Sequence, residues 1–240
     1  MSSVRIAVLD SGVHPSHPHV GGLAKGVQIT AEGEGEDTLD RLGHGTAIAA
    51  VIHHLAPQAE IVPVKIFDRQ LSTNLTCILR AVDWCLKNNI QVINLSLGTT
   101  NEDHRHSFEE MAAKVEQAGA VVVSAYSMKE TRLLPGRLTG VIGVVGDEDC
   151  EPTGYSIYSD ECKTVFGALL FPRDIPGVPR EANLNGVSFA VARISACIGQ
   201  LWLQRPHDQS WETFLAHRNP STSASVRALV EAQSLQGQDR

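Results

Sequence analysis

Short apolar runs alternate with longer segments along most of this chain, and this alternation restricts the fold more than any other feature. The runs suit strands buried on both faces of a sheet, and the longer segments carry helix signals such as Asn74 and Gly119. Strands that alternate with helices imply right-handed crossovers, so the sequence predicts an α/β fold with a mostly parallel sheet between two helical layers. The expected strands are residues 4–9, 27–30, 61–67, 92–97, 120–125 and 141–145, with short antiparallel strands over 155–167, and the expected helices are 44–54, 74–87, 107–118 and 186–203.

The length of 240 residues suits one α/β domain with a full core. No repeat, low-complexity segment or linker divides the chain, so we expect a main body over residues 1–204 and a more polar tail over residues 205–240. Helical patterns around Trp211, Phe214 and Leu215 and around Val226, Leu229 and Val230 are expected to clamp this tail onto the body. The last five residues are expected to be disordered.

Charge, hydropathy and cysteine content narrow the class of protein. The net charge of -7 has no basic stripe behind it, which argues against a nucleic-acid partner. No apolar stretch is long enough to cross a bilayer, and the first apolar run is too short for a secretory signal. The five cysteines have unmatched spacings in a chain too large to need disulfides. These features predict a reduced, cytoplasmic protein.

The segment Asp10-Ser11-Gly12 follows directly after the first expected strand. In an open parallel sheet this position lies at the carboxyl edge, where such folds gather their functional groups. The segment alone leaves three alternatives: a phosphoryl-accepting carboxylate, an aspartic peptidase motif, or an ordinary turn. The first normally has a second carboxylate two residues on, where this chain has Gly12, and the second needs a repeated motif in an all-β fold.

His44 lies between two glycines at the start of an expected helix. Flanking glycines let the backbone turn tightly and leave the imidazole unshielded, as a proton shuttle requires. Ser188 follows Asn185-Gly186-Val187 and precedes a long apolar helix, so free N–H groups at this helix terminus could bind a developing oxyanion. An ordinary polar histidine and a plain N-cap serine are the alternatives, although an N-cap alone does not explain the adjoining Asn-Gly turn.

Taken together, the three motifs resemble the active-site signatures of the subtilisin family of serine peptidases. They read Asp-Ser-Gly-Val with His17-Pro18 shortly after, Gly-His-Gly-Thr, and Asn-Gly-Val-Ser, in the family's chain order. Residues 62–67, 92–98, 134–135 and 141–144 also resemble the family, so the similarity spans about residues 4–203. The resemblance implies a subtilisin-like three-layer α/β/α fold in a compact intracellular form.

The resemblance also implies a catalytic triad of Asp10, His44 and Ser188. His44 would take the proton of Ser188 as its hydroxyl attacks a peptide carbonyl, and Asp10 would orient His44. The N–H of Ser188 would be one oxyanion donor. An extended peptide would pair as an added strand with one wall of the cleft. The residues implied in substrate binding are Ser96, Leu97, Gly98, Ala125 and Tyr126.

Two departures from the family pattern affect the predicted oxyanion site and specificity. Where the family has Ala-Gly-Asn this chain has Ala125-Tyr126-Ser127, so the asparagine that supplies the second oxyanion donor is absent. Ser127 is in the best register to replace it, and Met128 is one position on. Losing such a donor costs about 100- to 1000-fold in turnover, so Ser127 substitutes, another group does, or the enzyme is slow. Tyr126 in place of glycine predicts that large side chains are refused before the cut bond.

The predicted function is therefore a serine endopeptidase acting on an extended peptide, in its narrower form one dedicated precursor. A pseudopeptidase that binds peptides without cutting them is one alternative, favoured by the absent asparagine. A transpeptidase is another, although the compact chain has no obvious insertion for the helical segments of family members that cyclise peptides.

No cofactor is expected. The acidic loop over residues 32–40 fits no calcium-ligand spacing, and the cluster of His14, His17 and His19 carries only a weak zinc signal. The oligomeric state is not predicted from these features.

Overall fold

The computed structural model describes residues 3–128, 131–160, 163–174, 177–179, 182–218 and 223–225. Its main elements, in chain order, are β1 (Arg5–Asp10), β2 (Val27–Ile29), β3 (Glu34–Gly35), α1 (His44–Leu55), β4 (Glu60–Lys65), α2 (Leu75–Lys87), β5 (Val92–Leu95), α3 (Arg105–Gln117), β6 (Val121–Ala125), β7 (Ser127–Met128), β8 (Thr131–Arg132), β9 (Val141–Gly146), β10 (Ser156–Asp160), β11 (Lys163–Ala168), α4 (Val187–Leu201), α5 (Trp211–Arg218) and β12 (Ser223–Ser225).

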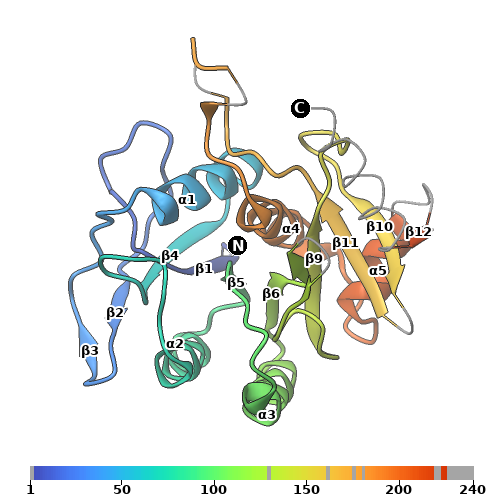
Figure 1. The fold of residues 1–240 in the computed structure, drawn as a ribbon, viewed down its shortest axis with the longest axis horizontal. Helices are drawn as coiled ribbons and strands as arrows, with labels where there is room; N and C mark the ends of the chain where they lie inside the picture. Colours follow the sequence, from blue (N-terminus) through green and yellow to red (C-terminus); the bar gives the residue numbers. More distant parts are fainter. Residues whose placement is uncertain are drawn as a thin grey trace.

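One ten-stranded sheet forms the centre of the molecule, in the order β12-β10-β11-β9-β6-β5-β1-β4-β2-β3. The pairs β10–β11 and β2–β3 are antiparallel, and every other pairing of described strands in this sheet is parallel. The helices α1 and α4 cover one face of the sheet, and α2 and α3 cover the other (Figure 1). The predicted α/β fold with a mostly parallel sheet between helical layers is confirmed.

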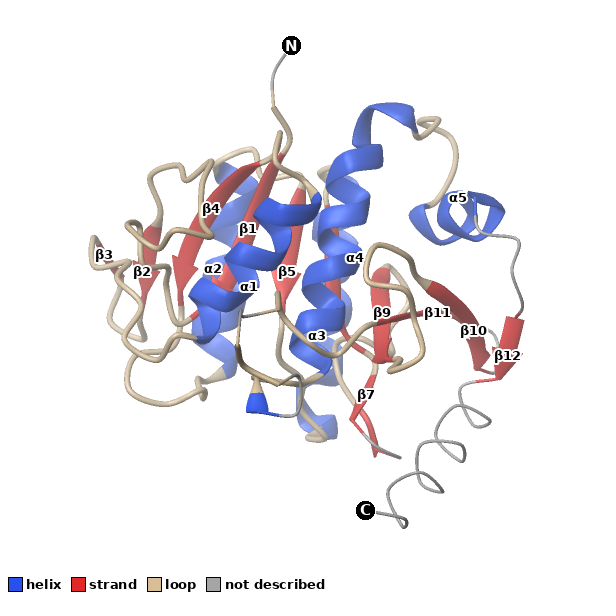
Figure 2. Ribbon diagram, turned by 90° about the horizontal axis from the view of Figure 1, so that it is seen from above, coloured by secondary structure: helices blue, strands red, loops and turns tan. Residues whose placement is uncertain are grey.

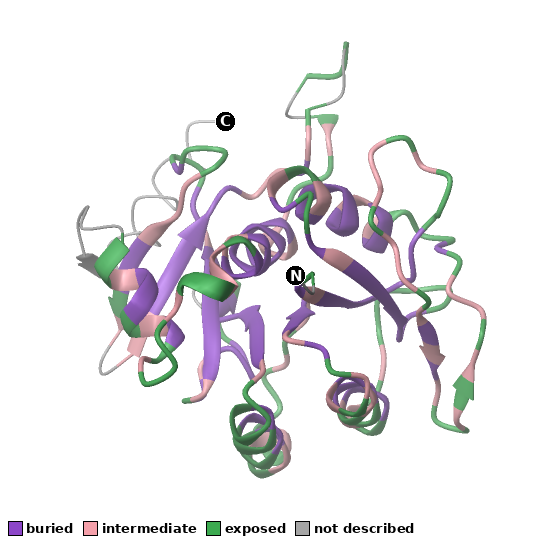
Figure 3. Ribbon diagram, turned by 180° about the vertical axis from the view of Figure 1, so that it is seen from behind, coloured by how far each residue is buried: buried purple, intermediate pink, exposed green. Residues whose placement is uncertain are grey.

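Each face of the sheet has its own apolar core. Side chains of α1, α4 and α5 pack with one face, and side chains of α2 and α3 pack with the other. Figure 3 shows that the buried residues line the sheet and the inner sides of the helices, while the outer sides of α2 and α3 are exposed. The apolar runs of the sequence therefore form strands because two helical layers exclude water from both faces.

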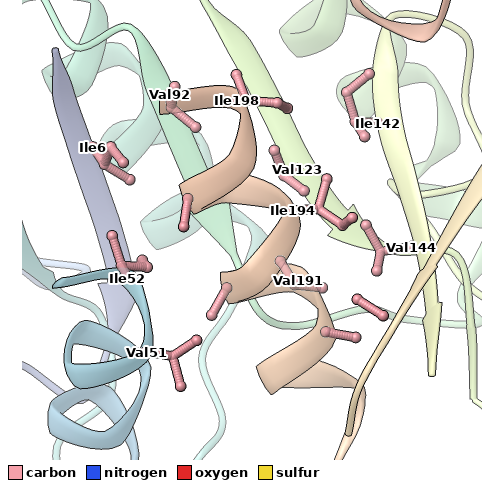
Figure 4. Packing of buried hydrophobic residues seen from close by; sticks show 14 of the residues in the cluster. Ile6, Val51, Ile52, Val92, Val123, Ile142, Val144, Val191, Ile194 and Ile198 are labelled. Atoms are coloured by element: carbon pink, nitrogen blue, oxygen red, sulfur yellow. The ribbon is translucent and has the colours of Figure 1, made fainter. Parts of the chain in front are cut away.

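Helix α4 crosses the sheet from its carboxyl edge to its amino edge. Val191 lies near Val144 of β9, and the other end of the helix places Ile198 near Val92, the first residue of β5 (Figure 4). At the same end, a Cβ added at Gly199 would lie 2.7 Å from Cδ1 of Ile6 in β1. The first turn of α4, which contains Ser188, therefore lies where the parallel strands end. Figure 2 shows α1 and α4 side by side over the central strands.

The structure adds elements that the sequence pattern did not reveal. β7 and β8 form a separate two-stranded hairpin, and the short strands β3 and β12 extend the sheet at its two edges. In the tail, α5 buries Trp211, Phe214 and Leu215 against the core of α1 and α4. The second helical pattern, from Val226, and the last five residues lie outside the described residues. No described helix is both long enough and apolar enough to cross a bilayer.

Candidate active site

Asp10 and His44 are in direct contact at the carboxyl edge of the sheet. Asp10 ends the central strand β1 and is completely buried, while His44 is the first residue of α1. The two carboxylate oxygens of Asp10 lie 2.9 and 3.0 Å from Nδ1 of His44. The main-chain N–H of Ser11 donates to the same carboxylate at 2.8 Å. This contact fixes the orientation of the imidazole and leaves Nε2 on the opposite side of the ring from Asp10.

The environment of His44 favours its protonated form. Burial lowers the pKa of His44, but the hydrogen bond and the charge of Asp10, together with the charge of Asp40, outweigh burial and raise the pKa above its ordinary value. An imidazole held this way is a stronger base than free histidine.

Asp40 holds the start of α1 in place. Its carboxylate accepts hydrogen bonds from the main-chain N–H groups of Leu42, Gly43 and Thr46 at 2.8 to 2.9 Å, and from the hydroxyl of Ser11 at 2.9 Å. Burial raises the pKa of Asp40, but these backbone bonds and the hydroxyl of Thr46 outweigh it and leave the pKa below its ordinary value. The carboxylate therefore caps α1 from outside the helix.

The two glycines beside His44 have different roles. Gly43 has φ 83°, a left-handed conformation that favours glycine, and an added Cβ would meet nothing within 4 Å. Gly45 is needed for close packing, because an added Cβ would overlap the carbonyl oxygen of Gly12 and lie 3.2 Å from Cβ of Asp10. Gly43 therefore allows a tight turn before α1, and Gly45 allows close contact with the loop that follows Asp10.

Ser188 lies in the first turn of α4, next to Phe189, whose ring centroid is 5.9 Å from that of His44. The hydroxyl of Ser188 donates to the main-chain carbonyl of Ser96 at 3.3 Å, and the hydroxyl of Ser96 donates to the carbonyl of Ser188 at 3.4 Å. The hydrogen bonds of the described residues do not include one between Ser188 and His44. The fold thus brings the three predicted triad residues to one edge, with the Ser188 hydroxyl directed at Ser96.

The predicted wall of the cleft, formed by Ser96, Leu97 and Gly98, is joined to two other segments of the chain. The hydroxyl of Ser124 donates to the carbonyl of Leu97 at 3.0 Å. Thr99 and Leu134 exchange two main-chain hydrogen bonds of 2.9 Å. Leu133, the residue before Leu134, packs against Gly98, since a Cβ added at Gly98 would lie 2.8 Å from Cβ of Leu133. Segments 96–99 and 133–134 are therefore in direct contact, and the first of them is joined to Ser188 through Ser96.

Tyr126 and Ser127 follow β6 at the same edge. The ring of Tyr126 is buried with Val145, Tyr158 and Val165, and its hydroxyl donates to Asp160. Val123 and Ala125 belong to the core under α4, and Ser127 begins β7 two residues after the end of β6. Ser127 is 7% exposed, and its hydroxyl has no hydrogen-bond partner among the residues that the structure describes. Met128 is 60% exposed.

Comparison with known proteins identifies the family. The family model described as "Subtilase family" matches residues 1–238. This chain belongs to the subtilase family. A subtilisin from Bacillus pumilus is 30% identical over 243 residues, which cover 96% of this chain and 83% of the relative. A thermostable alkaline protease from Halalkalibacterium halodurans is 28% identical over 206 residues, which cover 81% of this chain and 55% of the relative.

The chain spans only part of the length of several relatives. It spans 55% of the alkaline protease from H. halodurans and 60% of subtilisin NAT from Bacillus subtilis subsp. natto, which is less than two thirds of either. Among solved structures, a lanthipeptide protease has a TM-score of 0.67 at 17% identity, covering 89% of this chain and 78% of its own. Sphericase has a TM-score of 0.66 at 18% identity, covering 90% of this chain and 82% of its own. These structures support the subtilisin-like fold.

Sequence reasoning missed three residues of this subtilase site. Asp40 and Leu133 act through tertiary contacts that no short motif reports, although Asp40 lies only four residues before His44. Asp160 contacts Tyr126 across the sheet edge.

The rings of His17 and His19 lie edge-on with centroids 5.2 Å apart, and no group of three potential metal ligands occurs in the described part of the chain.

Proposed function

We propose that this subtilase is a serine endopeptidase in which Asp10, His44 and Ser188 form the catalytic triad. The observation that carries the proposal is the completely buried carboxylate of Asp10, bound to Nδ1 of His44 at the edge where α4 presents Ser188. A buried carboxylate that fixes one nitrogen of an imidazole leaves the other free to exchange a proton. This arrangement supports acyl transfer over the phosphoryl and aspartic-peptidase alternatives for Asp10.

The reaction requires the Ser188 hydroxyl to break its hydrogen bond with the carbonyl of Ser96. A hydrogen bond of 3.3 Å between two oxygens is long, so exchange for another staggered rotamer costs little. In the proposed reaction His44 removes the proton as Oγ of Ser188 attacks the peptide carbonyl carbon, and then gives it to the leaving amine. Water then hydrolyses the acyl-enzyme ester with His44 again acting as the base. The raised pKa of His44 supports both proton transfers.

We assign the oxyanion site to the N–H of Ser188 and the hydroxyl of Ser127. The N–H groups of the first turn of a helix lack intrahelical partners and can stabilise negative charge. The Ser127 side chain is buried, and its hydroxyl has no hydrogen-bond partner among the described residues, which supports this hydroxyl as the second donor. The side chain of Met128 is exposed and has no hydrogen-bond donor, which leaves Ser127 as the replacement for the family asparagine.

The substrate proposed is an extended peptide that pairs with Ser96, Leu97 and Gly98, with Ala125 and Tyr126 near the opposite wall. Leu133 packs against Gly98, one of these residues, and we propose that this contact restricts the residue before the cut bond to a small side chain. This restriction supports the narrower proposal of one dedicated precursor.

A cytoplasmic location is also proposed. The described cysteines, Cys77, Cys85, Cys150 and Cys197, are all free thiols, which supports a reducing compartment. Alkylation of freshly lysed cells without reductant, followed by mass spectrometry, tests this. A disulfide in the native protein would contradict it.

A peptide-binding pseudopeptidase is the second candidate. Two observations favour it: the Ser188 hydroxyl is bonded to Ser96, and the family asparagine is absent. The two candidates differ in whether Ser188 reacts.

The deciding experiment combines a fluorophosphonate with a diverse peptide library read by mass spectrometry. An endopeptidase is labelled and cuts peptides, and Ser188→Ala abolishes both. The matched control Ser107→Ala, in α3 on the other face of the sheet, keeps both. Ligated or cyclised products would indicate a transpeptidase. Folded protein that binds peptides without labelling or cleavage would overturn the peptidase proposal in favour of the pseudopeptidase.

A further inference from the structure

The side chains of the hairpin formed by β7 and β8 make few buried contacts that would fix its position. Its two strands pair only with each other, outside the ten-stranded sheet. Met128, Thr131 and Arg132 are exposed, so among its described residues only Ser127 is buried. An isolated two-stranded hairpin is at best marginally stable in water. The position of Ser127 therefore depends on contacts made at the two ends of the hairpin.

Tyr126 fixes the beginning of the hairpin. Its N–H donates to the carbonyl of Val144 at 2.7 Å, which continues the pairing of β6 with β9. Its carbonyl accepts from the N–H of Leu133 at 2.7 Å. Its ring is buried against β9, β10 and β11, and its hydroxyl donates to Oδ2 of Asp160.

Asp160 joins this contact to the end of the hairpin. It is the last residue of β10, and its Oδ1 accepts from the guanidinium of Arg132 at 2.7 Å. Arg132 is the residue paired with Ser127 across the hairpin. The side chain of Asp160 is 17% exposed, so its bonds are partly shielded from water. One carboxylate thus binds the residue before Ser127 and the residue opposite Ser127.

We propose that Asp160, through Tyr126 and Arg132, is a positioning residue for the oxyanion site. This inference rests on the proposed function, in which Ser127 donates to the oxyanion. A donor is effective only when it lies about 2.7–3.1 Å from the position of the oxyanion, and a displacement of about 1 Å can cost about 100-fold. The hydroxyl of a serine reaches less far than the amide of an asparagine, so its backbone has to be held more closely.

The first test is removal of the Tyr126 hydroxyl. Tyr126→Phe keeps the buried ring and loses the bond to Asp160, and Asp160→Asn weakens both contacts. We expect kcat to fall about tenfold in each with KM unchanged, because a mispositioned donor weakens only transition-state binding. The matched control is Tyr158→Phe, which removes a hydroxyl that donates to Asp147 at 2.6 Å from the same apolar cluster. Equal losses of kcat in Tyr126→Phe and Tyr158→Phe would indicate a general structural effect and overturn the proposal.

The second test is a double-mutant cycle with Ser127→Ala. If Asp160 acts through Ser127, Tyr126→Phe has no further effect on kcat once the Ser127 hydroxyl is gone. Independent, additive losses would overturn the proposal. An unchanged kcat in Ser127→Ala, with turnover still abolished in Ser188→Ala, would overturn this inference and leave the peptidase intact. Absence of turnover in the folded wild-type protein would overturn both.

Discussion

Leu133 packs directly against the α-carbon of Gly98, one of the residues proposed to bind the substrate. Tyr126, which the sequence suggested as the residue that refuses large side chains, has its ring among Val145, Tyr158 and Val165 instead. A preference for small side chains before the cut bond stays a prediction, with Leu133 as the side chain that enforces it.

We therefore expect Leu133→Ala to widen the range of residues accepted before the cut bond. In a peptide library, wild-type protein should cut after Gly and Ala, and the variant should gain cleavage after Leu or Phe. A matched change at the highly exposed Leu203 should not alter the preference. Equal wild-type cleavage after Phe and after Ala would contradict this prediction.

The glycines on either side of His44 should respond differently to alanine. At Gly43 the added methyl meets nothing, so Gly43→Ala should lower the free energy of unfolding by only about 1–2 kcal/mol, the cost of a left-handed conformation. At Gly45 the methyl would overlap the carbonyl oxygen of Gly12 and crowd Asp10. Gly45→Ala should therefore lose both more stability and nearly all turnover, measured by chemical denaturation and peptide cleavage. Equal effects of the two substitutions would show that Gly45 does not set the contact between α1 and Asp10.

Acid should inactivate this protein through His44. The raised pKa of His44 means that the neutral base required by the proposed mechanism is lost as pH falls through a value above that of free histidine. The same shift stabilises the folded state below the unfolded pKa of histidine, and that contribution is lost as pH rises through the folded pKa.

Asp10→Asn removes the hydrogen bond and charge that raise the pKa of His44, so the midpoint of kcat/KM against pH should move down. Turnover should also fall about 10,000-fold, as expected when the imidazole loses its orienting carboxylate. An unmoved midpoint would show that Asp10 does not set the basicity of His44.

Local sequence patterns predicted the order of the strands and helices and the start of α2. The alternation of apolar runs gave the order of strands and helices, and Asn74 caps α2 as expected by accepting from the N–H of Cys77. The β7–β8 hairpin was not predictable, because two-residue strands show no alternation of apolar and polar residues. The contact of Leu133 with Gly98 and that of Tyr126 with Asp160 exist only after distant strands assemble. The Ser188 hydroxyl bond to Ser96 is a rotamer choice, which no motif encodes.

The buried cation of Lys65 should stabilise the loop that leads to His44. Lys65 is 1% exposed, and its Nζ donates to the carbonyl of Leu39 at 2.9 Å and to Asp37 at 3.2 Å. The hydrogen bond from Arg41 outweighs burial and, together with Lys65, lowers the pKa of Asp37 to about 2. Lys65→Met keeps most of the volume but leaves the Leu39 carbonyl without this donor, so the free energy of unfolding should fall by about 1–3 kcal/mol at neutral pH.

The pH dependence of this loss follows from the depressed pKa of Asp37. A carboxylate of this kind contributes stability above its unfolded pKa and loses it as pH falls through the folded value of about 2. The difference in free energy of unfolding between wild type and Lys65→Met should therefore shrink as the pH falls toward 2. This change with pH should be small, because Asp37 is partly exposed. Lys25→Met, at an exposed lysine 3.8 Å from Glu36, is the matched control and should change stability by less than about 1 kcal/mol. A Lys65 variant as stable as this control would show that the buried ammonium does not hold the loop.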